Sequence, residues 1–173
     1  MENLLQTVDE IRRMSESELA QVAEDGLTTR LREQGEAAHL LYGGLQASNL
    51  GSFLEDRNHV RRPTRLVMEF GEMGMHQFAQ PDSDIRNPDG RVLYLRPVLG
   101  KRPDYLVRAV AYMIPLINYG EIIGDEHCIT YGAALYAETE DQFYHSICEL
   151  ADWVGATESF PEESTSGSPC SCH

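Results

Sequence analysis

The sequence predicts an α+β fold, in which a helical N-terminal region precedes a mostly antiparallel sheet that helices cover on one face. Three observations lead to this prediction. Apolar residues recur at helical spacing before residue 42, alternate with polar residues between residues 64 and 99, and mostly return to helical spacing after residue 103. The order of elements expected after residue 62 is β-β-β-α-β-α, with two or three helices packed on the sheet.

Helices are expected along the N-terminal region, which we place at residues 1–62. Residues 1–14 have the pattern of an amphipathic helix, and the capping-box sequence Ser15-Glu-Ser-Glu18 starts a second helix. We expect Gly26 to end or bend this second helix, because glycine weakens a helix interior. The pair Gly43-Gly44 then stops the helical stretch.

Three strands are expected where apolar and polar side chains alternate. They cover residues 64–70, 75–80 and 91–99. The sequences Pro81-Asp-Ser-Asp84 and Asn87-Pro-Asp-Gly90 are turn signals between the second strand and the third. We expect these strands to pair in a mostly antiparallel sheet.

The pattern after the third strand predicts a helix, a strand and a second helix. Pro103 occupies the first-turn position that proline tolerates, and the helix that it begins ends at Gly120. Residues 127–137 are rich in small and β-favouring side chains, which predicts a buried strand. The capping-box sequence Thr139-Glu-Asp-Gln142 opens the last helix, and Gly155 stops it.

The chain after the N-terminal region divides into two parts. Residues 63–155 form the α+β domain. Residues 156–173 consist mostly of Glu, Ser, Thr, Gly and Pro, which is typical of a flexible acidic tail, and they end in Cys-Ser-Cys-His.

Charge is distributed unevenly along the chain. Residues 57–108 hold 10 basic and 6 acidic side chains, whereas residues 109–173 hold 11 acidic side chains and neither lysine nor arginine. The whole chain has a formal net charge of −14. This balance argues against nucleic acid as a partner, because phosphate binding relies on clustered Lys and Arg. It favours a protein partner with a basic surface.

We interpret the chain as a soluble cytoplasmic protein that makes no membrane contact. No apolar run approaches the roughly 18 residues that a membrane span requires. The first residues, Met-Glu-Asn-Leu-Leu-Gln, have neither the basic start nor the apolar stretch of a signal peptide.

An arginine-rich segment is the candidate anion site. Guanidinium groups bind carboxylates and phosphates in a bidentate manner, so these side chains could hold an anion where the segment meets the sheet. The alternative is internal neutralisation, in which the same arginines pair with the acids of the flanking segments. The candidate residues are Arg61, Arg62, Arg65, Arg96 and Arg102.

Glu69, Glu72 and His76 are the first candidate metal ligands. On a helix their spacing would place all three on one face, and Glu36 with His39 would be the partner pair on another helix. Gly71 and Gly74 oppose a helix here. The alternative is therefore two exposed acids and a partly buried histidine.

The tail supplies a second candidate metal set, Cys170, Cys172 and His173. Two thiols and an imidazole within four residues suit a soft metal ion, with zinc or iron as the cofactor that either set could hold. The two thiols could instead form a disulfide or react with oxidants, or the tail could have no role. The expected fold requires no cofactor.

Three functions are compatible with these observations. The first is a non-enzymatic acidic module that binds another protein, as an adaptor, an inhibitor or an accessory subunit, and that could also form a homo-oligomer through its amphipathic N-terminal helices. The second is a small metal-binding or redox protein that uses either candidate metal set. The third is an enzyme that acts on an anionic small molecule held by the arginine segment.

Overall fold

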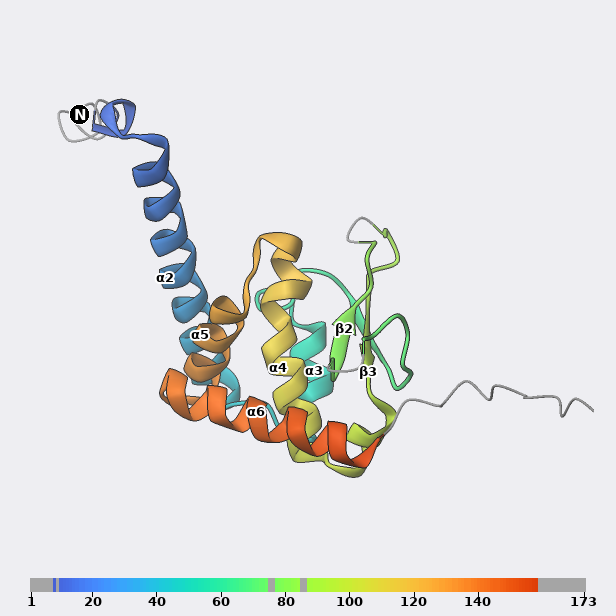
Figure 1. The fold of residues 1–173 in the computed structure, drawn as a ribbon. Helices are drawn as coiled ribbons and strands as arrows, with labels where there is room; N and C mark the ends of the chain where they lie inside the picture. Colours follow the sequence, from blue (N-terminus) through green and yellow to red (C-terminus); the bar gives the residue numbers. More distant parts are fainter. Residues whose placement is uncertain (1–7, 9, 75–76, 85–86, 159–173) are drawn as a thin grey trace, which may run out of the picture.

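The computed structural model describes residues 8, 10–74, 77–84 and 87–158, and within them the α+β prediction is confirmed. Figure 1 shows a long helix at one edge of the molecule, a small sheet at the other, and shorter helices between them. The helices are α2 (Glu16–Tyr42), α3 (Leu50–Glu55), α4 (Pro103–Tyr119), α5 (Asp125–Tyr136) and α6 (Glu140–Thr157). The strands are β1 (Thr64–Val67), β2 (Ala79–Pro81) and β3 (Arg91–Leu95), and 3₁₀ turns cover Pro97–Lys101 and Gly120–Ile122.

The sheet is mixed, which corrects the expected mostly antiparallel pairing. Its strand order is β1-β3-β2. β3 runs parallel to β1, with Thr64 opposite Arg91, and antiparallel to β2, with Ala79 opposite Leu95. The long connection between β1 and β3 permits the parallel pairing, because it gives the chain room to return to the starting edge. Helix α4 packs against β2 and covers one face of the sheet.

Helix α2 is continuous, so the expectation that Gly26 ends or bends it was wrong. Its two ends match the sequence signals: the Ser15 side chain and the Glu18 side chain form the reciprocal capping box, and Gly43 adopts a left-handed φ of 65° at the C-terminus. Open space surrounds Gly26, whereas Gly35 is buried against α5. A single glycine costs a helix only about 1 kcal/mol, which the packing of α2 on α5 offsets.

The strand predicted over residues 127–137 is wrong, because this segment forms helix α5. The helix is buried against α2, α4 and α6, so most of its side chains are apolar or small and the sequence shows no helical stripe. Close packing reinforces the helix: a Cβ atom added at Gly132 would overlap the ring of Phe143. Tertiary contacts therefore override the β preference of residues such as Ile129 and Tyr131.

Helices α4 and α6 begin at the predicted signals, and α4 also ends at its predicted glycine. Pro103 occupies the first turn of α4, and the Gly120 N–H donates to Leu116 O. Thr139 and Gln142 form the predicted capping box at the start of α6. The expectation that Gly155 stops this helix was wrong, because α6 continues to Thr157, two residues into the segment assigned to the tail. Both helices contribute to one apolar core that also includes Leu31 of α2 and Phe53 of α3.

Candidate functional site

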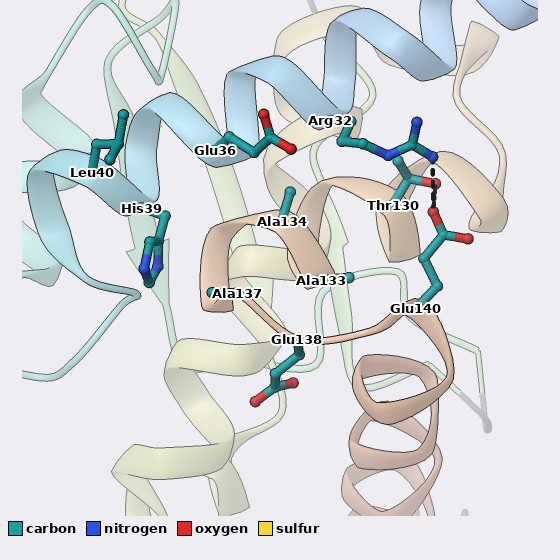
Figure 2. Close-up of a pocket in the computed structure, with 10 residues that line it drawn as sticks. All are labelled: Arg32, Glu36, His39, Leu40, Thr130, Ala133, Ala134, Ala137, Glu138 and Glu140. Atoms are coloured by element: carbon teal, nitrogen blue, oxygen red, sulfur yellow. Dashed lines mark hydrogen bonds and ion pairs between the residues drawn. The ribbon is translucent and has the colours of Figure 1, made fainter.

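A groove of about 440 Å³ lies where α2, α5 and the start of α6 meet. Figure 2 shows α2 along one side of it, with α5 and the turn to α6 along the other. Most of its surface is apolar, and its charged side chains stand around the margin. Its lining residues are Arg32, Glu36, His39, Leu40, Thr130, Ala133, Ala134, Ala137, Glu138 and Glu140.

Alanines of α5 form the floor of the groove. Ala133 is buried, Ala134 is half-buried and Ala137 is exposed, and none has a side chain long enough to fill the space between the two helices. Gly35 brings the helices together at this level, because its Cα faces Tyr131 O and Ala134 Cβ without an intervening side chain. The floor is therefore shallow and apolar, with closely packed helices beneath it.

Two of the three marginal carboxylates are neutralised by neighbours. Glu140 Oε1 accepts from Thr130 Oγ1 at 2.9 Å and from Arg32 Nη2 at 3.3 Å. Glu138 accepts two hydrogen bonds from Arg108, at 2.6 Å and 2.9 Å. This bidentate pair is strong and orients Glu138.

Glu36 is the marginal carboxylate without such a partner. It is exposed, and it makes no hydrogen bond or ion pair with any residue that the structure describes. Figure 2 shows the Glu36 side chain on the α2 side of the groove, next to the alanine floor at Ala134. The groove therefore carries one negative charge that the described part of the protein leaves uncompensated.

His39 has a defined orientation in the same groove. Its Nδ1 lies 2.9 Å from Leu135 O. A carbonyl oxygen only accepts hydrogen bonds, so Nδ1 carries the proton, and Nε2 of the neutral ring has the free lone pair. Glu36 and His39, which the sequence indicated as one pair, thus line the same space. Among the described residues they belong to no group of three or more His, Cys, Asp or Glu side chains that could hold a metal ion.

The five candidate anion-binding arginines do not surround one space. Arg61 stacks on the Tyr119 ring at 4.2 Å and donates to its hydroxyl at 2.9 Å. Arg102 pairs with Asp104 at 2.6 Å. Tyr119 and Arg102 lie at opposite ends of α4, and 17 helical residues span about 25 Å, so one small anion cannot contact both arginines.

The remaining three arginines also lie apart. Arg96 is 1% exposed and donates to Gln77 O at 2.8 Å and to Gly74 O at 3.0 Å, which is a structural role. Arg62 and Arg65 are exposed on either side of the entry to β1, and Arg65 lines a separate cavity of about 620 Å³. Anion binding at these two residues stays a prediction.

Internal neutralisation of the arginine segment is limited among the described residues. Arg108 with Glu138 is the ion pair that joins this segment to the acidic C-terminal region. Arg91 pairs with Asp82 and Arg102 with Asp104, both within the segment itself. Most acids of the flanking regions therefore keep their charge toward solvent.

The first candidate metal set is only partly described. Glu69 and Glu72 are exposed in the loop after β1 and do not lie on a helix, and His76 falls outside the described residues. Among residues 8, 10–74, 77–84 and 87–158, no three His, Cys, Asp or Glu side chains gather closely enough to hold a metal ion. The second set, Cys170, Cys172 and His173, lies entirely outside the described residues.

His127 and Cys128 lie in the first turn of α5, where the sequence predicted the start of a strand. His127 Nδ1 accepts from the Gly124 N–H at 3.1 Å, so the proton of the neutral ring is on Nε2, which lies 2.8 Å from Glu24 Oε1. Cys128 is buried, and this burial raises its pKa to about 12. Neither residue is arranged as a nucleophile with its base.

Cys128 is expected to resist alkylation in the folded protein. Iodoacetamide reacts with the thiolate, and at pH 8 the raised pKa keeps the Cys128 thiol protonated. Mass spectrometry of peptides produced by cleavage after glutamate, which places Cys128 and Cys148 in different peptides, should show Cys128 unmodified before denaturation and modified after it. Half-buried Cys148 is the internal control and should react faster. Equal rates for the two thiols in the folded protein would contradict the expected burial.

Sequence reasoning missed the groove as a whole. It identified Glu36 and His39, but it assigned the floor to a strand, so Ala133, Ala134 and Ala137 had no reason to face α2. The signal that could have revealed the contact is the set of small residues in both segments, since such residues let two helices approach closely.

Comparisons of the chain with models of known protein families, with curated proteins and with solved structures found no match. Within the described ranges, no helix is both long enough and apolar enough to cross a membrane. Function is therefore inferred from the chemistry of the site.

Proposed function

We propose that this protein is a non-enzymatic module that binds a basic segment of another protein in the groove between α2, α5 and α6. The observation that carries the proposal is the uncompensated Glu36 carboxylate beside an alanine floor. A lysine or arginine side chain matches both features, because its aliphatic stem can lie on the alanines while its charged end reaches a carboxylate.

The margin of the groove supports this choice of ligand. His39 Nε2 offers a hydrogen-bond acceptor, whereas the Glu138 and Glu140 carboxylates accept hydrogen bonds from Arg108 and Arg32. Arg32 partly offsets the negative charge at one end, which favours a ligand whose cationic group approaches from the Glu36 end. Nothing in this set resembles a nucleophile activated by a base.

The charge of the surrounding surface would guide such a partner. Helix α6 continues from the groove and exposes Asp141, Glu149 and Asp152, with no lysine or arginine along its length. Long-range attraction of this kind raises the association rate of oppositely charged proteins and weakens as salt increases. The proposed binding should therefore be strongest at low ionic strength.

The test uses two fluorescein-labelled peptides of equal length, one with arginine and alanine repeated and one with glutamate and alanine repeated. Fluorescence anisotropy at 50 mM and 300 mM NaCl measures their binding to the full chain. We expect binding of the basic peptide that weakens at the higher salt, and none of the acidic peptide. Equal binding of both peptides, or no binding of either, would overturn the proposed function.

Glu36→Gln locates the site. Removing one exposed charge that contacts a cation costs about 1 kcal/mol, so we expect the variant to bind the basic peptide about fivefold more weakly. Glu126→Gln makes the same chemical change at an exposed position outside the groove and should lose much less. Equal losses in the two variants would show that the peptide binds the acidic surface in general and not this groove.

A further inference from the structure

A second surface of α2 is exposed along the whole helix, on the side away from the core. We call it the outer face. Four large aliphatic side chains on it are unusually accessible: Leu19 is 40% exposed, Val22 56%, Leu40 84% and Leu41 70%. At 3.6 residues per turn these positions fall on one broad side of the helix. The outer face consists of Leu19, Val22, Ala23, Gly26, Arg30, Glu33, Ala37, Leu40 and Leu41, all exposed.

Nothing in the described part of the chain covers this face. The core side of α2, with Leu31, Gly35 and Ala38, packs on α5. Figure 1 shows α2 at the edge of the molecule, with its N-terminal half extending beyond the other helices. Aliphatic side chains at both ends of a solvent-exposed face are unfavourable in water. Exposed apolar surface of this kind marks an interaction site.

The order of residues on the outer face is self-complementary. Aliphatic and small residues occupy both ends, and the oppositely charged pair Arg30 and Glu33 lies between them. We infer that two copies of this chain associate through their outer faces, with the two α2 helices antiparallel. This inference does not depend on the proposed function, and the two surfaces share only Leu40.

A single register satisfies both the charged and the apolar positions. A twofold axis between residues 31 and 32 places Arg30 of each copy opposite Glu33 of the other. The same axis places Gly26 opposite Ala37 and Val22 opposite Leu41. A twofold interface must repeat every contact in this way, and here each repeated contact pairs compatible residues.

The small residues allow close approach of the two helices. Gly26 has no atom within 4 Å of the position that a Cβ would take, so its surroundings are free. Helix axes approach to about 8 Å when the residues at the contact are small. From Val22 to Leu41 the paired segment would extend about 28 Å, and each projecting N-terminal half would lie on the C-terminal half of the other copy.

Charge reversal tests the register. Arg30→Glu places two acids opposite each other, and Glu33→Arg places two arginines opposite each other. The double variant Arg30→Glu/Glu33→Arg restores opposite charges. Sedimentation velocity across a concentration series should show wild type and double variant rising from 19.5 kDa toward twice that mass, with each single variant at least tenfold weaker.

The Glu33→Arg variant distinguishes loss of the Arg30–Glu33 pairing from a change in the general repulsion between two acidic chains. It makes the net charge less negative than −14, so reduced repulsion alone would strengthen self-association, whereas the register predicts that it weakens. A wild-type chain that stays monomeric at every concentration overturns the inference. Tighter association of the Glu33→Arg variant than of the wild-type chain would also overturn the inference.

Cross-linking gives an independent check. Val22→Cys/Leu41→Cys should form a disulfide-linked dimer under mild oxidation, because the register brings residue 22 of one copy beside residue 41 of the other. Within one chain the two positions are about 28 Å apart along the helix. The two single variants and wild type control for the native cysteines and should cross-link much less. Equal cross-linking in all four proteins would contradict the antiparallel register.

Discussion

Gly35→Ala is expected to destabilise the fold by about 1–3 kcal/mol, as overpacked cores do. The new Cβ would lie 2.6 Å from Tyr131 O and 2.7 Å from Ala134 Cβ. The first of these contacts is with backbone, so no side-chain rotation can relieve it. Helices α2 and α5 would have to separate, and the floor of the groove would move with them.

Gly26→Ala is the matched control in the same helix. No atom lies within 4 Å of the Cβ position at Gly26, so helix propensity alone should stabilise the protein by about 0.5–1 kcal/mol. Because Gly26 lies on the outer face, urea denaturation of both variants is measured at protein concentrations where sedimentation velocity shows only monomer. Opposite signs are expected. A stabilised Gly35→Ala protein would mean that α2 and α5 do not pack as closely as described.

Arg96→Ala is expected to cost about 3 kcal/mol or more of folding free energy. The side chain is 1% exposed, and its guanidinium donates hydrogen bonds to the carbonyls of Gly74 and Gln77 in the loop before β2. Hydrogen bonds to charged groups contribute about 1.5–3 kcal/mol each, and the carbonyls would lose their donors. Phe70, whose ring centroid lies 5.0 Å from the guanidinium, would lose a contact too.

Arg96→Lys distinguishes the contribution of the positive charge to stability from that of the guanidinium geometry. Lysine keeps the positive charge, but its single ammonium cannot reproduce the planar fork that reaches two carbonyls. We expect the lysine variant to recover less than half of the lost stability, as measured by thermal and urea unfolding. If alanine at position 96 is tolerated within about 0.5 kcal/mol, the side chain does not anchor this loop.

The elements that the sequence identified well have local causes. Ser15 and Thr139 satisfy the first N–H groups of α2 and α6 through capping boxes, and Gly43 can adopt the left-handed conformation that ends α2. These signals act within four residues, so a sequence displays them without knowledge of the fold. The α+β class follows from the same local patterns.

The elements that the sequence misassigned have causes in tertiary packing. Helix α5 is surrounded by other helices, so the amphipathic pattern that would identify it is absent. The parallel pairing of β1 with β3 depends on the path of the long connection between them, which no local pattern specifies. Gly26 is tolerated because the other residues of a 27-residue helix hold it in place.

The sequence identified only part of the candidate site for the same reason. Glu36 and His39 share a helix, so their spacing predicted their proximity correctly. The arginines differ, because whether Arg96 faces a ligand or the carbonyl of Gln77 depends on residues far away in sequence. Composition can suggest that a charged group binds something, but only the packing shows whether that partner belongs to the protein itself.

Helix α2 presents the groove on one side and the outer face on another, and this arrangement has a consequence for avidity. In the proposed twofold pairing, the two Glu36 positions would be about 14 Å apart along the helix direction. A partner with two basic segments joined by a short linker could occupy both grooves at once. The second binding event would then be intramolecular, so two weak contacts would act together as one strong contact.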